Sequence, residues 1–137
     1  MPPPTATRAS TTVAVLADDL IWGTRIAATI EGLGGHHAAR LRTLPDLVAW
    51  LAAPERSALD AVVVDLTARS YDGVAAIAAA TGRGRRVLAV GQHDDVALRR
   101  RALEAGAERV YAYRKLFEDG RATLATWLGG SAPPATA

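Results

Sequence analysis

Short apolar runs rich in β-branched residues alternate with helical patterns along this chain of 137 residues. The clearest run is 58–66, with the sequence ALDAVVVDL. Because it is short and mostly apolar, it predicts a strand that is buried on both faces of a sheet. Further strands are predicted at 12–17, 87–90 and 110–113, with a weaker one at 37–41.

Segments with helical spacing lie between the predicted strands. In 20–33 the apolar residues recur at helical intervals, and Gly34-Gly35 ends the pattern. Pro45 fits the first turn of the next helix. Helices are predicted at 20–33, about 44–53, 74–81, 95–105 and 117–128. This alternation predicts a parallel sheet of five strands with helices on both faces, joined by right-handed crossovers.

The two ends of the chain differ from its middle. Residues 1–10 carry three prolines and little to bury, and residues 129–137 read GGSAPPATA. We expect both to be disordered tails around one domain at 11–128. Half of all residues are hydrophobic and 22% are charged, which is typical of a folded domain rather than a disordered chain.

Composition also limits the classes of function. The absence of cysteine excludes disulfides and Cys-based zinc or redox chemistry, and it fits a cytoplasmic protein. The start of the chain is not a signal peptide, and no apolar run approaches the roughly 20 residues of a membrane span, so no membrane partner is expected. A net charge of +2 is too small an excess to predict a nucleic-acid partner.

Acidic residues stand where two of the predicted strands end. Asp18-Asp19 follows the first strand, and Asp65 ends the run AVVV. Because the carboxyl ends of parallel strands meet at one edge of the sheet, we expect these side chains to converge there. Such carboxylates can hold a hard cation such as Mg²⁺ and offer an oxygen as a phosphoryl acceptor. Taken alone, an Asp-Asp pair in this position is also an ordinary cap for the next helix.

Over residues 12–128 the chain resembles the receiver domain of two-component response regulators. The resemblance rests on Asp18-Asp19, Asp65, Asp72-Gly73 and Ala105-Gly106-Ala107. It implies a flavodoxin-like (βα)5 three-layer α/β sandwich with a parallel sheet in the order 2-1-3-4-5. It also implies that Asp65 is the phosphoryl acceptor, and that the ligands of Mg²⁺ are Asp18, Asp19, Asp65 and the backbone carbonyl of Thr67.

The chain also departs from the receiver pattern. Gly91 stands where a receiver has Thr or Ser, Tyr113 where it has Lys, and Val110 where it has an aromatic residue. Without the lysine, three carboxylates crowd one site and repel one another unless a cation binds. Two outcomes stay open: the site depends more strongly on Mg²⁺, or Arg114 or Lys115 reaches in as a substitute.

A second and less specific resemblance is to small stand-alone receiver-like proteins, and it implies no known activity. It rests on Asp18-Asp19-Leu20, Arg25, Gly91-Gln92-His93, and Arg114 with Phe117. Other features have ordinary explanations: His93 is interpreted as a loop residue beside a helix cap, and Arg99-Arg100-Arg101 as a solvated helix face. Two carboxylates in the first strand–helix turn exclude a dinucleotide site there, and the chain lacks the nucleophile elbow of a hydrolase.

The resemblance and its departures lead to two functional hypotheses. The first is a pseudo-receiver: a non-enzymatic signalling protein that acts through protein–protein contacts, since the combined loss of the Thr/Ser, Lys and aromatic positions argues against phosphorylation. Its contacts are expected on the face formed by helix 95–105, strand 110–113 and helix 117–128, through which receivers also pair as homodimers. The alternative is a working receiver that takes a phosphoryl group on Asp65, with Mg²⁺, in a phosphorelay. The implied partners are a histidine kinase, a phosphotransfer protein or a downstream effector.

Overall fold

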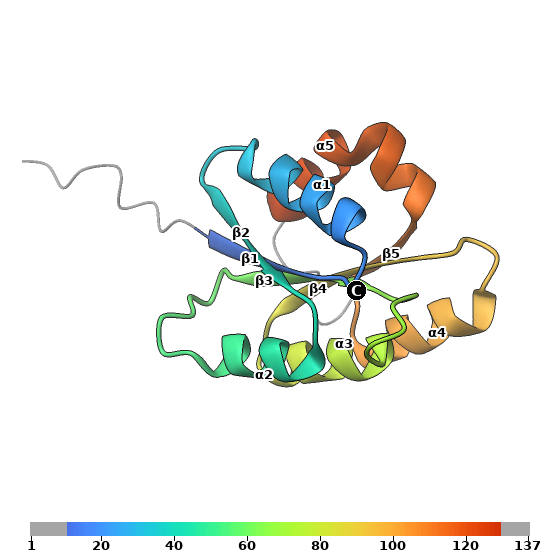
Figure 1. The fold of residues 1–137 in the computed structure, drawn as a ribbon, viewed down its shortest axis with the longest axis horizontal. Coiled ribbons are helices and arrows are strands. Elements are labelled where there is room, and N and C mark those ends of the chain that lie inside the picture. Colours follow the sequence, from blue (N-terminus) through green and yellow to red (C-terminus); the bar gives the residue numbers. More distant parts are fainter. Residues whose placement is uncertain (1–10, 130–137) are drawn as a thin grey trace, which may run out of the picture.

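A computed structural model describes residues 11–129 and contains a five-stranded parallel sheet in the order β2-β1-β3-β4-β5 (Figure 1). The predicted sheet order and flavodoxin-like class are therefore confirmed. The strands are β1 (Thr11–Leu16), β2 (His36–Leu41), β3 (Ala61–Asp65), β4 (Arg86–Gly91) and β5 (Arg109–Ala112). The helices are α1 (Leu20–Glu31), α2 (Leu44–Ala52), α3 (Gly73–Gly82), α4 (Val96–Ala105) and α5 (Tyr113–Gly129). None of the described helices is both long and apolar enough to cross a membrane.

The helices cover the sheet on both faces, with α1 and α5 on one side and α2, α3 and α4 on the other (Figure 1). Successive strand residues point to opposite faces. Val13, Val15 and Val63 therefore pack toward α1 and α5, while Val62 and Val64 pack toward the other three helices. All five residues of β3 are buried. Burial on both faces explains why this strand is a continuous apolar run rather than an alternating one.

One predicted strand begins later than its apolar run. The run 58–66 predicts a strand of nine residues, but β3 starts at Ala61. The reason is Asp60, which is 2% exposed and whose carboxylate accepts hydrogen bonds from the backbone N–H groups of Ser57 and Thr12, each at 2.9 Å. This carboxylate closes a turn before the strand and ties it to the first residues of β1, so the three residues before Ala61 do not join the sheet.

The last helix begins four residues earlier than predicted. The pattern predicts a strand at 110–113 and a helix from Phe117, whereas β5 ends at Ala112 and α5 starts at Tyr113. The helix is interrupted at Asp119, which has non-helical backbone angles (φ −139°, ψ 31°). It continues through Gly129, one residue into the predicted C-terminal tail. The rest of both predicted tails, 1–10 and 130–137, lies outside the described residues.

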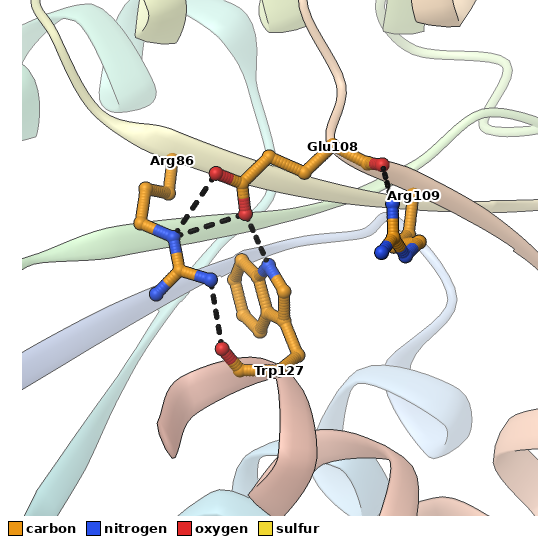
Figure 2. A network of polar contacts seen from close by, with 4 residues as sticks. All are labelled: Arg86, Glu108, Arg109 and Trp127. Carbon is orange, nitrogen blue, oxygen red and sulfur yellow. Dashed lines mark hydrogen bonds and ion pairs between the residues drawn. The ribbon is translucent and has the colours of Figure 1, made fainter. Parts of the chain in front are cut away.

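A polar network fastens the end of α5 to the amino edge of the sheet (Figure 2). The Glu108 carboxylate accepts hydrogen bonds from Arg86 Nε, at 2.9 and 3.1 Å, and from Trp127 Nε1 at 2.9 Å. Arg86 Nη2 in turn donates to the backbone carbonyl of Trp127 at 2.8 Å. Because the Arg86 and Glu108 side chains are only 22% and 12% exposed, this ion pair is shielded from solvent. It holds α5 against β4 and β5.

Gly106 permits the sharp turn between α4 and β5. Its φ is 119°, and a Cβ at this position would lie 2.5 Å from Thr81 Cγ2. Gly34 also has a positive φ, of 74°, but no heavy atom lies within 4 Å of its virtual Cβ. Among the glycines of residues 11–129, Gly106 alone combines a left-handed backbone with a close neighbour.

We expect Gly106→Ala to lower the free energy of unfolding by about 1–3 kcal/mol more than Gly34→Ala, because overpacking against Thr81 adds to the backbone strain that both variants share. Urea denaturation of the two variants measures this difference directly. Equal destabilisation by the two substitutions would show that the contact with Thr81 relaxes without cost.

Candidate functional site

The loop after β1 and the end of β3 bring three carboxylates to one cavity. Asp18 and Asp19 lie between β1 and α1, and Asp65 is the last residue of β3. All three line a cavity of about 520 Å³ at the carboxyl edge of the sheet. The other lining residues are Ile21, Trp22, Thr67, Arg69, Tyr113 and Phe117. The predicted convergence of the acidic residues is thus present in the structure.

Asp65 is held by neutral hydrogen-bond donors. Its side chain is 3% exposed, and Oδ1 accepts hydrogen bonds from the backbone N–H and the hydroxyl of Thr67, each at 3.0 Å. The Tyr113 hydroxyl donates to the same oxygen and lies in contact with the Thr67 hydroxyl. A buried carboxylate needs such partners because it has lost its water. Here they come from a phenol, an alcohol and an amide, none of which carries charge.

Tyr113 occupies the position at which the receiver resemblance implies a lysine. Burial, followed by its hydrogen bond to Asp65, raises the pKa of the Tyr113 phenol well above its usual value, so it stays protonated and donates at neutral pH. Its ring meets Trp22 edge-to-face, with the ring centroids 5.6 Å apart. Packing and hydrogen bonding together therefore fix the phenol against Asp65.

Neither of the two nearby cations substitutes for the missing lysine. Arg114 pairs with Glu118 at 2.8 Å, and Lys115 pairs with Asp119 at 3.4 Å, both along the outer side of α5. The Arg114 side chain is 84% exposed. Within the described part of the chain, no Lys or Arg forms an ion pair with Asp65. Of the two outcomes that the sequence left open, the one in which Arg114 or Lys115 reaches into the cavity is not found, because each is paired with a carboxylate one turn along its own helix.

Asp19 serves as a helix cap as well as lining the cavity. It is the N-cap of α1, where its Oδ1 accepts a hydrogen bond from the backbone N–H of Trp22 at 2.9 Å. The bond satisfies one of the N–H groups that the first helical turn leaves without a partner. Asp19 therefore both caps α1 and lines the cavity.

Asp18 ties the loop after β3 to the loop after β1. Its Oδ2 accepts hydrogen bonds from the backbone N–H groups of Arg69 and Ser70, at 2.9 and 3.2 Å, and from the Ser70 hydroxyl at 3.1 Å. Burial opposes ionisation of Asp18, but these hydrogen bonds outweigh it and lower the pKa of the carboxyl below its usual value. Asp18 is therefore a structural tie across the cavity.

The side chains do not form a ready-made metal site. Residues 11–129 contain no group of three or more His, Cys, Asp or Glu side chains arranged to hold a metal ion. The predicted Mg²⁺ ligands Asp18, Asp19, Asp65 and Thr67 all line the cavity, but one oxygen of each carboxylate is already bonded to protein donors. Each carboxylate keeps a second oxygen, so these residues fit Mg²⁺ only if their side chains turn toward one common point.

The motif Asp72-Gly73 supports the loop rather than the cavity. Asp72 is the N-cap of α3 and accepts from the backbone N–H groups of Val74 and Ala75 at 3.0 and 3.1 Å. A Cβ at Gly73 would lie 3.0 Å from the Cα of Leu66. The glycine therefore lets α3 start directly against the end of β3.

At two further positions that differ from the receiver pattern, Gly91 and Val110, the surroundings are apolar. Gly91 ends β4 beside Leu66, whose Cδ1 and Cβ would lie 3.3 and 3.4 Å from a Cβ at this glycine. Val110 is 9% exposed and belongs to the core on the α2–α3–α4 side of the sheet. His93 is exposed in the loop before α4, as expected of a solvated residue, and the cap of that helix is Asp95.

Sequence reasoning missed three contributors to this site. Tyr71 places its hydroxyl 2.9 Å from the Leu16 carbonyl oxygen and 2.8 Å from that of Asp65, so it bridges the ends of β1 and β3. The Thr67 hydroxyl and Ser70 bind Asp65 and Asp18, respectively. The sequence does show hydroxyl side chains two to six residues after Asp65, and these could have been noted as hydrogen-bond donors for the site. It does not show which acceptor each hydroxyl binds, because that depends on how the loop folds.

The phenol on Asp65 should make a measurable contribution to stability. We expect Tyr113→Phe to lower the free energy of unfolding by about 1.5–3 kcal/mol, the range for a hydrogen bond to a charged group. Tyr111→Phe is the matched control: Tyr111 is half-buried on β5, and its hydroxyl makes no hydrogen bond within the described residues, so a change below about 0.5 kcal/mol is expected. Equal effects in urea denaturation would contradict this role of Tyr113.

The lowered pKa of Asp18 predicts a specific acid sensitivity. Because the folded-state pKa lies below the unfolded value, the unfolded chain takes up the proton first as the pH falls. The stabilisation is complete above about pH 4 and is lost as the pH falls through the folded-state pKa. Urea midpoints between about pH 6 and pH 2.5 should therefore fall less steeply for Asp18→Asn than for the wild type. Parallel curves would rule out a contribution from this carboxylate.

Of the comparisons with known proteins, the one with solved structures identifies the fold. No protein-family model matches the sequence, and no curated protein matches it. Solved structures do match: a receiver domain from Rhodospirillum rubrum is 17% identical with a TM-score of 0.73, covering 89% of this chain and 96% of that one. The receiver domain of a sensor histidine kinase from Pseudomonas aeruginosa, with a magnesium ion in its active-site cleft, is 20% identical with a TM-score of 0.71, covering 89% and 100%.

A third match is a response regulator from Burkholderia pseudomallei that contains a phosphorylated aspartic acid and a calcium ion. It is 19% identical with a TM-score of 0.70, and the alignment covers 84% of this chain and 65% of that one. At these identities the similarity concerns the arrangement of the elements. The five strands and five helices of residues 11–129 have the fold of response-regulator receiver domains.

Proposed function

We propose that this protein is a pseudo-receiver, a signalling module with the receiver fold that acts by binding other proteins and does not use phosphorylation of Asp65 as its signal. The observation that carries this proposal is the hydrogen bond from the Tyr113 phenol to Asp65, at the position where the receiver resemblance implies a lysine.

This hydrogen bond is poorly suited to phosphoryl transfer. The transferred group spreads negative charge over its oxygens, and catalysis depends on cations and donors that are already positioned to neutralise it. A protonated phenol offers one hydrogen bond and no charge. Its hydroxyl also occupies Asp65 Oδ1, one of the two oxygens that could attack phosphorus. Gly91, at the end of the neighbouring strand β4, has no side chain that could supply a hydroxyl.

The proposed contact surface is the α4–β5–α5 face. On α4 only Ala102 is buried, and Val96 and Leu103 are 62% and 45% exposed. Arg99, Arg100 and Arg101 are exposed on the same helix. Exposed apolar residues surrounded by charge are typical of a protein interface. The occupant is a downstream effector, a kinase or phosphotransfer protein, or a second copy of the chain.

A working receiver is the second candidate, and one observation favours it. Asp18, Asp19 and Asp65 line a single cavity together with Thr67, and solved proteins of this fold carry a phosphorylated aspartic acid or a magnesium ion. For this candidate to hold, the Tyr113 hydroxyl must leave Asp65. Mg²⁺ would then be bound by Asp18, Asp19, Asp65 and the backbone carbonyl of Thr67, and it would supply the positive charge that the phenol lacks.

Labelling with a small phosphodonor separates the two candidates. Wild-type protein, Asp65→Ala and Tyr113→Lys are incubated with acetyl phosphate and Mg²⁺, and the bound phosphate is measured by intact-protein mass spectrometry. We expect wild type and Asp65→Ala to be equally unlabelled. Tyr113→Lys is expected to gain at least about tenfold in labelling, because it restores a cation beside the acceptor.

The double variant Asp65→Ala, Tyr113→Lys is the control for site specificity and should lose that gain. Mg²⁺-dependent labelling of the wild type that disappears in Asp65→Ala would contradict the pseudo-receiver proposal and establish the second candidate.

A further inference from the structure

Two large apolar side chains stand exposed beside the cavity and form what we name the apolar rim: Ile21, which is 82% exposed, and Phe117, which is 47% exposed. Both line the same cavity as Asp65. Ile21 comes from the first turn of α1 and Phe117 from the second turn of α5, and these helices pack side by side on one face of the sheet (Figure 1). The rim therefore joins two elements at the place where the acidic residues gather.

Arg25 contacts one side chain of the rim, Phe117. The Arg25 guanidinium lies 4.3 Å from the centroid of the Phe117 ring and donates a hydrogen bond to the Phe117 carbonyl at 3.5 Å. Arg25 follows Ile21 by one helical turn, so both lie on the same side of α1. A cation stacked on one face of the ring fixes its orientation and leaves the remaining surface for another contact. Preorganised apolar surface of this kind lowers the cost of binding.

The cavity beside the rim carries an excess of negative charge. Three carboxylates line it, from Asp18, Asp19 and Asp65, against one guanidinium, from Arg69. Arg69 forms no ion pair with them among the described residues. The walls beside these charges include the aromatic rings of Trp22 and Tyr113. The matching ligand has a positive end and an apolar stem.

We propose that the cavity and the apolar rim together form a docking surface for a protein partner that inserts a lysine side chain among the carboxylates and covers Ile21 and Phe117 with a neighbouring apolar side chain. The lysine stem packs against Trp22 and Tyr113, and the ammonium group reaches Asp19 and Asp65. The inference rests on the proposed function, because a phosphoryl group or a metal on Asp65 would occupy the same cavity.

Lysine fits this site better than arginine. The carboxylates come from the loop after β1 and from the end of β3, so they do not present one flat pair of oxygens. The planar arginine fork suits a single bidentate acceptor. An ammonium group with three freely rotating donors can satisfy oxygens in different directions. A second copy of this chain is a poor source, since its only lysine, Lys115, is held by Asp119 at 3.4 Å.

The test is an NMR titration of the full chain in EDTA, without phosphodonor, using the peptide acetyl-Leu-Lys-Leu-amide as the probe. Acetyl-Leu-norleucine-Leu-amide, which keeps the stem and removes the charge, is the matched peptide. We expect millimolar binding of the lysine peptide, with shifts centred on Ile21, Trp22, Thr67 and Phe117, and binding by the norleucine peptide that is at least about fivefold weaker.

Three variants locate the contact. Asp19→Asn keeps the α1 cap and removes one charge, so the Kd should rise about fivefold. Ile21→Ser alters an exposed rim residue and should weaken binding by a similar factor, since about 1 kcal/mol of apolar burial is lost. Asp95→Asn makes the same change at the N-cap of α4, away from the cavity, and should leave the Kd within about twofold.

Each other outcome overturns the inference. These outcomes are no shifts at the cavity up to about 10 mM peptide, equal binding of the two peptides, or an unchanged Kd in Asp19→Asn. If ethylammonium alone binds as tightly as the peptide, the cavity is a site for small amines. If the wild type is a dimer and Ile21→Ser is a monomer, the rim is a self-association surface. If acetyl phosphate labels Asp65 and the peptide still binds, only the proposed function is contradicted. If Asp65 is not labelled and the peptide does not bind, only this inference is contradicted.

Discussion

A buried carboxylate has to be satisfied within the protein, and in this fold that requirement falls on Asp65. The residue ends the most buried strand of the sheet and is 3% exposed. Its hydrogen bonds come from Thr67 in the following loop and from Tyr113 at the junction of β5 and α5. The Tyr113 bond joins elements 48 residues apart. The first turn of α5, and with it the position of Phe117 beside α1, depends on how this one charge is accommodated.

The other two acidic residues have become part of the framework while still bordering the cavity. Asp19 starts α1, and Asp18 holds the loop after β3 through two backbone N–H groups and one hydroxyl. Hydrogen bonds that stabilise these loops also fix the carboxylates in place. The negative potential that these carboxylates create at neutral pH is therefore built into the folded chain and is present without a metal or a phosphoryl group. A cationic partner residue can exploit such a potential without any chemistry at Asp65.

Much of the architecture could be predicted from the sequence. The apolar runs indicate strands that are buried on both faces, and the helical spacing between them indicates which helix faces pack on the sheet. The strand order came from the receiver resemblance, and the convergence of Asp18, Asp19 and Asp65 followed from the carboxyl ends of parallel strands. What could not be predicted is decided by side chains that meet only after folding. Asp60 delays the start of β3 by bonding Thr12, 48 residues away. The sequence places Tyr113 near the acidic site, but no local pattern says that its hydroxyl turns toward Asp65, or that Lys115 turns toward Asp119.

The contact between Gly91 and Leu66 has a consequence for the side chains that the end of β4 can accept. Leu66 lies where it would press on any β-carbon at position 91, with closest distances of 3.3 and 3.4 Å. A threonine or serine at position 91 would therefore require Leu66, a side chain of the core, to shift by a few tenths of an ångström. The space for a hydroxyl at the end of β4 is thus set by a residue of the β3–α3 loop. Positions 66 and 91 are coupled, and a smaller side chain at position 66 should make a hydroxyl at position 91 easier to accept.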